Sequence, residues 1–93
     1  MTNEHLIEIL KMNLGKTTGT WDKYLYTLLN TARAEIKREG ITIADTPDDD
    51  NLIIMYAAYL FRKRAEDSAT MPRMLRYALN NREISEKGAV DES

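Results

Sequence analysis

A run of ten consecutive uncharged residues, Leu52–Phe61, constrains this chain more than any other feature. Its apolar side chains fall on every side of a helix, so a helix over about 49–66 must be packed from several directions. Ten residues are too few to span a bilayer, which needs about 20. The run therefore predicts the central helix of a small all-α bundle, and no membrane contact.

Three further segments predict helices around that centre. Residues 3–14 carry leucines at helical spacing and end at a glycine. A stripe in the second segment, which ends at Gly40, is the clearest amphipathic pattern: Trp21, Leu25, Leu28, Leu29, Ala32 and Ile36. The fourth helix is expected over 72–82 with these residues inward: Met74, Leu75, Ala78 and Leu79. The expected fold class is thus all-α with about four helices.

Helix-capping residues set the expected boundaries. Thr20 is the expected N-cap of the second helix, and one aspartate of the loop 45–50 is expected to cap the third. From Glu83 onward the chain is polar and small. We therefore expect one helical domain over 1–82, followed by a flexible acidic tail over 83–93.

Composition excludes several classes of function. The chain of 93 residues has no Cys and one His, which excludes disulfides, thiolate zinc sites and a cysteine nucleophile, and makes a multi-histidine metal site improbable. The first residues lack the basic and apolar regions of a secretory signal. No hydroxyl has a recognisable partner base. The expectation is a protein that is not an enzyme and has no cofactor.

Two short motifs resemble ligand sites and fail on spacing. Gly15-Lys16-Thr17 resembles the end of a phosphate-binding loop, but Leu10 stands where that motif needs a glycine. The four aspartates of 45–50 lack the alternate acids, the glycine and the final glutamate of a calcium loop. Helix capping explains those aspartates better.

Charge is segregated along the chain although the net charge is only -2. The loop 45–50 and the segment 83–93 are acidic, whereas 52–82 is basic. One interpretation is helix-dipole complementation and ordinary solvated faces. The other is matching between neighbouring subunits, with an acidic set (Asp48, Asp49, Asp50) facing one or more members of a basic set (Arg62, Arg64, Arg73, Arg76).

Aromatic residues exceed what a single small core needs. Tyr24, Tyr26 and Tyr77 are candidates for a subunit interface, where tyrosine is enriched. The alternative is a monomer whose core has an aromatic edge. A basic, aromatic fourth helix also leaves a DNA-binding or DNA-packaging accessory role open, although the low isoelectric point disfavours it.

Three stretches of the sequence resemble one protein family. These are 28–41, which contains LLNTARAEI and EGI; 49–64, DDNLIIMYAAYLFRKR; and 71–82, MPRMLRYALNNR. They are similar to segments of the small head–tail connector proteins of tailed phages and of prophages in Gram-positive bacteria. The resemblance covers about 3–88, and residues 2–14 match less distinctively.

That resemblance implies a four-helix subunit without catalytic residues or cofactor. About a dozen copies would form a ring beneath the portal protein, seal the DNA-filled head and dock the next head-completion or tail protein. DNA would pass through the ring without sequence-specific binding. The implied location is the head–tail junction of the virion, after synthesis in the host cytoplasm.

Overall fold

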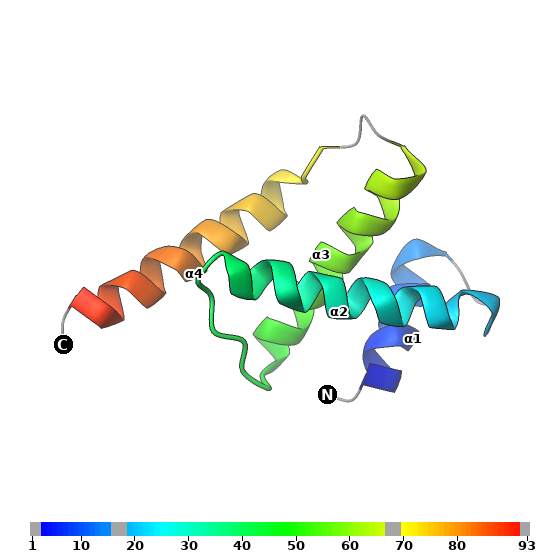
Figure 1. The fold of residues 1–93 in the computed structure, drawn as a ribbon, viewed down its shortest axis with the longest axis horizontal. Helices are drawn as coiled ribbons and strands as arrows, with labels where there is room; N and C mark the ends of the chain where they lie inside the picture. Colours follow the sequence, from blue (N-terminus) through cyan, green and yellow to red (C-terminus); the bar gives the residue numbers. More distant parts are fainter. Residues whose placement is uncertain (1–2, 16–18, 67–69, 92–93) are drawn as a thin grey trace.

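Four α-helices make up the fold (Figure 1). The computed structural model describes residues 3–15, 19–66 and 70–91. The helices are α1 (Asn3–Leu14), α2 (Asp22–Arg38), α3 (Pro47–Ala65) and α4 (Arg73–Asp91), with a 3-10 turn η1 (Gly19–Trp21) before α2. The described residues contain no strand, so the predicted all-α bundle of about four helices is confirmed.

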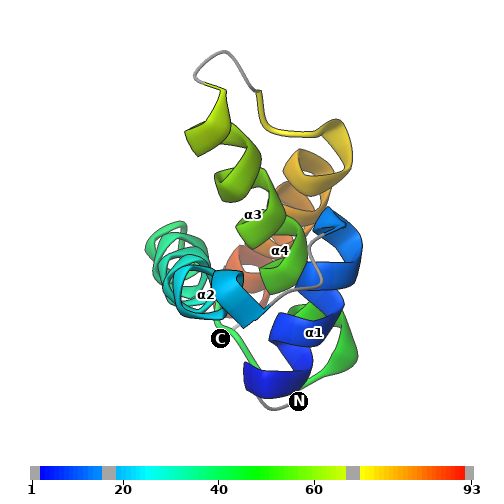
Figure 2. The same ribbon diagram turned by 90° about the vertical axis from the view of Figure 1, so that its right-hand side faces the viewer.

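Helix α3 lies at the centre of the bundle, as its uncharged run predicts. The other three α-helices each pack on it. Figure 2 shows α2 on one side of α3 and α1 on the other. Ala57 and Ala58 are fully or almost fully buried, which allows neighbouring helices to approach closely. None of the described helices is long and apolar enough to cross a membrane.

The core is built mainly by the facing stripes of α2 and α3. The predicted stripe of α2 is buried except for Trp21, which lies in η1 and is partly buried; Leu25, Leu29 and Ile36 are fully enclosed. Burying each such side chain contributes about 1.5–3 kcal/mol. Helix α1 adds Leu6 and Leu10, and an ion pair of 2.8 Å between Lys11 and Asp22 ties its last turn to the start of α2.

Helices α1 and α2 each end shortly before a glycine, as the sequence predicts. Gly15 after α1 and Gly40 after α2 have φ values of 71° and 90°, in the left-handed region that side chains avoid. The expected caps were wrong. Helix α2 has Trp21 at its N-cap because η1 leads directly into it, and no side-chain hydrogen bond caps it there.

Thr46, and not an aspartate, caps α3. Its hydroxyl accepts a hydrogen bond of 3.2 Å from the backbone N–H of Asp49. The helix therefore starts at Pro47, which suits a first position because proline has no N–H to leave unpaired. The three aspartates of the first turn instead lie at the positive end of the helix dipole.

Helix α4 differs most from the prediction. It continues past Arg82 to Asp91, so residues 83–91 are helical and not an irregular tail (Figure 1). Leu75 and Leu79 are buried as expected, but Met74 is 75% exposed, because α4 packs chiefly on α3 and buries a narrow stripe. The mobility of 83–93 stays a prediction, and residues 92–93 lie outside the described part.

Candidate interaction surfaces

The described residues do not assemble a metal centre. No group of three or more His, Cys, Asp or Glu side chains within the described ranges could hold a metal ion. The helix that precedes Gly15-Lys16-Thr17 is confirmed, while Lys16 and Thr17 lie outside the described residues. The candidate features described below are exposed surfaces, two hollows and the charged groups beside them.

One charged network joins three parts of the fold. Asp49, in the first turn of α3, accepts hydrogen bonds from the Arg82 guanidinium of α4 and from the backbone N–H of Ala44. Arg82 also donates to the carbonyl of Thr42 at 2.8 Å. Burial alone would raise the pKa of Asp49, but the hydrogen bonds from Arg82 and Ala44 outweigh it and hold that pKa below its usual value.

The three aspartates of the acidic set differ in exposure. Asp48 is exposed and open to a partner, but Asp49 is only 3% exposed and Asp50 is also buried. The Asp49 carboxylate binds Arg82 of its own chain, and a contact of Asp49 with a neighbouring subunit stays a prediction. Arg82 was not among the residues that the sequence predicted to carry function.

The basic set lies on the surface, where it was expected. All four arginines, Arg62, Arg64, Arg73 and Arg76, are exposed, at the end of α3 and the start of α4. Aromatic rings position part of this surface. The Arg64 guanidinium lies 5.4 Å from the ring centre of Tyr24, and the Lys63 ammonium lies 5.7 Å from that of Tyr59. Such cation–π contacts restrain cations without neutralising them.

The three candidate tyrosines have different environments. Tyr24 belongs to an aromatic cluster with Trp21 and Phe61, at ring-centre distances of 6.4 and 5.9 Å. Tyr24 and Tyr26 are partly buried, so each has one face in the core. Tyr77 is 60% exposed and is open to a partner.

Sequence reasoning missed two exposed apolar residues and misplaced a third. Met12 on α1 and Ile84 on α4 are 79% and 69% exposed, and Met74 points outward rather than inward. On α4, Met74, Tyr77 and Ile84 follow the three- and seven-residue spacing of one helix face. That spacing was visible in the sequence. Because the helix was expected to end at Arg82, Ile84 was not counted on that face.

A groove opens between the first half of α2 and the last turns of α3. We call it the α2–α3 groove; it has a volume of about 290 Å³ and is lined by Tyr24, Thr27, Leu28, Thr31, Leu60, Lys63 and Arg64. Its floor is apolar and its rim carries two cations. Such a lining suits an apolar side chain on an acidic segment better than a small polar substrate.

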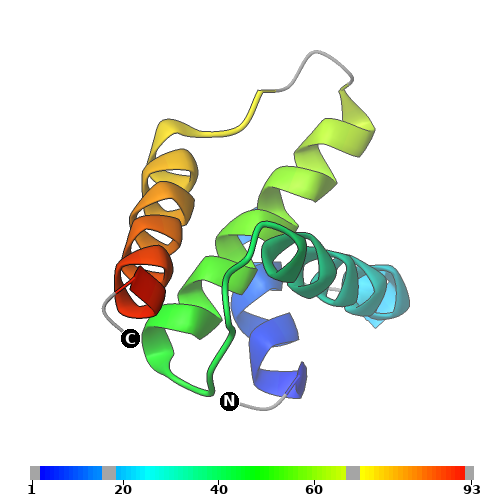
Figure 3. The same cartoon turned by 60° about the vertical axis from the view of Figure 1, so that its left-hand side comes forward.

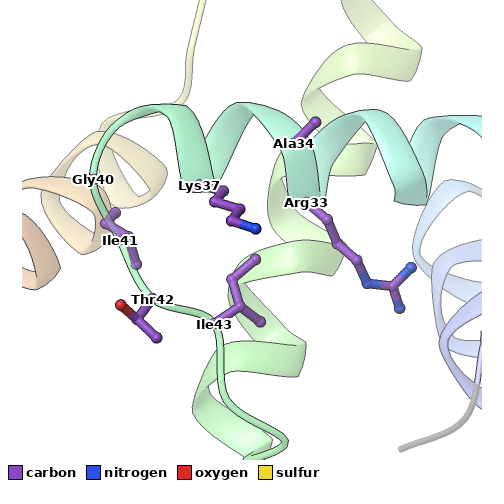
Figure 4. A pocket seen from close by; sticks show the side chains of 7 residues that line it. All are labelled: Arg33, Ala34, Lys37, Gly40, Ile41, Thr42 and Ile43. Atoms are coloured by element: carbon purple, nitrogen blue, oxygen red, sulfur yellow. The ribbon is translucent and has the colours of Figure 1, made fainter.

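A second hollow lies where the chain leaves α2 (Figure 4). Its volume is about 630 Å³, and the lining residues are Arg33, Ala34, Lys37, Gly40, Ile41, Thr42 and Ile43. Figure 4 shows the Lys37 side chain above the loop that carries the two isoleucines. Figure 3 shows this loop descending from the end of α2 to the start of α3. Among the described residues that line the hollow there is no carboxylate and no imidazole.

Comparisons with models of protein families, with curated proteins and with solved structures found no match. What supports a function for this chain is therefore its own sequence pattern and its surfaces.

Proposed function

We propose that this chain is a structural subunit of a phage head–tail connector. It assembles into a ring of about a dozen copies beneath the portal protein. The three sequence stretches 28–41, 49–64 and 71–82, which resemble that family, support this proposal. In the fold these stretches cover most of α2, nearly all of α3 and the first half of α4.

The observation that carries the proposal is the amount of large apolar surface left outside a completed core. Met12, Met74, Tyr77 and Ile84 are each at least 60% exposed in a chain of 93 residues. Scattered single apolar residues are ordinary on a monomer, but three on one helix face are not. Met and Tyr are also the residue types enriched at protein interfaces. The pattern supports an assembling subunit.

In the proposed ring each subunit makes several kinds of contact. Each subunit would use two different patches to contact its neighbours, so that the rotation closes the circle. One face of the ring would bind the portal protein and the other the next head-completion or tail protein. DNA would pass through the channel without sequence-specific contacts. In this role the chain is not an enzyme, needs no cofactor and resides at the head–tail junction of the virion.

A DNA-binding or DNA-packaging accessory protein is the second candidate. The exposed arginines at the end of α3 and the start of α4, with Tyr77 beside them, favour it. The net charge of -2 weighs against it. A phosphate-binding surface normally belongs to a basic domain.

Electron microscopy of the purified chain, paired with a DNA titration, separates the two candidates. The connector proposal expects closed rings with a central channel, and duplex binding that is weak and independent of sequence. An accessory protein would instead form no ring, and its DNA affinity would fall steeply with salt because phosphate contacts release counterions. That second outcome would overturn the connector proposal.

A further inference from the structure

The rim of the α2–α3 groove is held in a fixed arrangement. Arg64 lies over Tyr24, which itself packs on Phe61 at the start of the last turns of α3. Lys63 is held over Tyr59. Leu28 is almost fully buried beneath the groove and Leu60 is partly exposed. An occupant therefore meets an apolar floor with two aromatic-restrained cations in the same lining.

Residues 83–91, which we call the α4 arm, have the opposite character. Arg82 is the residue that bonds α4 to Asp49 and Thr42. The helix continues nine residues beyond it, and Figure 1 shows this end leading away from the other helices. The arm's sequence holds three acids and one base. It also carries Ile84, 69% exposed. The arm thus combines an apolar side chain with net negative charge.

The groove and the arm lie at opposite ends of the molecule. Figure 1, with the longest axis horizontal, places the end of α4 at the left, and the first half of α2 and the last turns of α3 at the right. That axis measures 48 Å. The two features therefore do not meet within one chain. A contact between them joins the tail of one copy to the head of the next, and such contacts build rings or filaments.

We propose that the α2–α3 groove receives the α4 arm of a second copy of this chain. Ile84 packs on the apolar floor formed by Leu28 and Leu60. The acidic arm lies against the Lys63 and Arg64 rim, where opposite charge sets the register of the two copies. The inference rests on the proposed self-assembly and identifies the contact through which the ring grows.

Cysteine cross-linking tests this contact cleanly because the chain has no cysteine of its own. The test mixes an Ile84→Cys protein with a Thr27→Cys protein, whose new thiol lies in the groove. The matched control mixes Ile84→Cys with Lys37→Cys. Lys37 is also exposed on α2, but lies ten residues on, about 15 Å along the helix.

A docked arm holds two thiols within disulfide reach, which raises their effective concentration. We expect the Thr27→Cys mixture to form the mixed dimer at least roughly tenfold faster than the control. Equal rates in the two mixtures would overturn the inference, as would a faster reaction at position 37. The second outcome would move the contact to the hollow beside α2.

A charge-reversal experiment adds a readout that does not depend on thiols. Lys63→Glu with Arg64→Glu should weaken self-association by roughly tenfold, since both substitutions repel an acidic arm. Ile84→Asp should weaken it too, whereas Ile9→Asp, at an exposed apolar position on α1 outside both the groove and the arm, should not.

Helical content by circular dichroism confirms that each variant is folded. Wild-type rings without preferential cross-linking at position 27 would overturn the groove contact and leave the proposed function standing. A wild-type chain that never self-associates would overturn both.

Discussion

Asp49 and Arg82 lie 33 residues apart in the sequence and bond to each other in the fold. The Asp49 side chain is almost fully buried, while that of Arg82 remains partly exposed. Through Thr42 and Ala44 the same pair also holds the loop between α2 and α3. One arginine therefore fixes the position of α4 against the start of α3, and with it the direction in which the α4 arm leaves the bundle.

The first prediction concerns that arginine. Arg82→Ala removes the hydrogen bonds to Asp49 and Thr42 and leaves a buried carboxylate without its cation. The free energy of unfolding should fall by about 2–3 kcal/mol, measured by urea denaturation. Arg73→Ala, at an exposed position on the same helix, is the control and should change it by less than about 0.5 kcal/mol. Equal effects would show that the pair does not hold α4.

The second prediction is an acid dependence of stability. The folded-state pKa of Asp49 lies below its ordinary value of 3.8, so the charged form is favoured by folding. This stabilisation is present above that value and is lost as the pH falls through the folded-state pKa. The difference in unfolding free energy between wild type and Asp49→Asn should therefore be constant near neutral pH and shrink below 3.8. A difference that does not change with pH would contradict this.

The third prediction tests the cap of α3. Thr46→Ala removes the acceptor for the backbone N–H of Asp49 and should cost about 1 kcal/mol of unfolding free energy. Thr46→Ser keeps the hydroxyl and should stay within about 0.5 kcal/mol of wild type. If serine proved as costly as alanine, the methyl group rather than the hydrogen bond would carry the effect.

The fourth prediction compares two glycines. Gly40 has a φ of 90°, which an alanine adopts only with strain, so Gly40→Ala should lower the unfolding free energy by about 1–2 kcal/mol. Gly19 has no positive φ, and a Cβ there would lie 3.9 Å from the nearest atom, an Asp22 carboxylate oxygen. Gly19→Ala should therefore change it by less than about 0.5 kcal/mol. Thermal melts of the two variants make the comparison.

Much of the fold was predictable because it depends on short-range patterns. The stripe of α2 predicted its buried residues, Trp21 excepted, and the uncharged run of α3 predicted its central position. Helices α1 and α2 end close to Gly15 and Gly40 because glycine readily adopts the positive φ found there. These features need no knowledge of which helices meet, so periodicity and glycine placement are enough.

The predictions that failed did so for different reasons, and only one of them is a long-range pairing. Nothing near Asp49 distinguishes it from Asp48 or Asp50 in the sequence, yet the fold brings Arg82 of α4 to the Asp49 carboxylate. Thr46 caps α3 because the helix starts at Pro47. An aspartate was expected instead, since several aspartates lie beside Thr46 and aspartate is also a good cap. The extension of α4 was missed because the segment after Arg82 is polar and contains Gly88.

The candidate surface was predictable in part. The exposed arginines and Tyr77 were found from charge segregation and aromatic content. The α2–α3 groove was not, because it forms between residues of two helices that are distant in the sequence. Met12 and Met74 could not be placed outside the core without knowing how narrow a stripe each helix buries.

Solution mass by light scattering over a concentration series tests the central claim most directly. A connector subunit should give a discrete species near a dozen times the 10.7 kDa mass of one chain, with no larger species as concentration rises. Closed rings explain such a limit, because the last contact leaves no free patch. A mass that stays at that of one chain across the series would contradict the account.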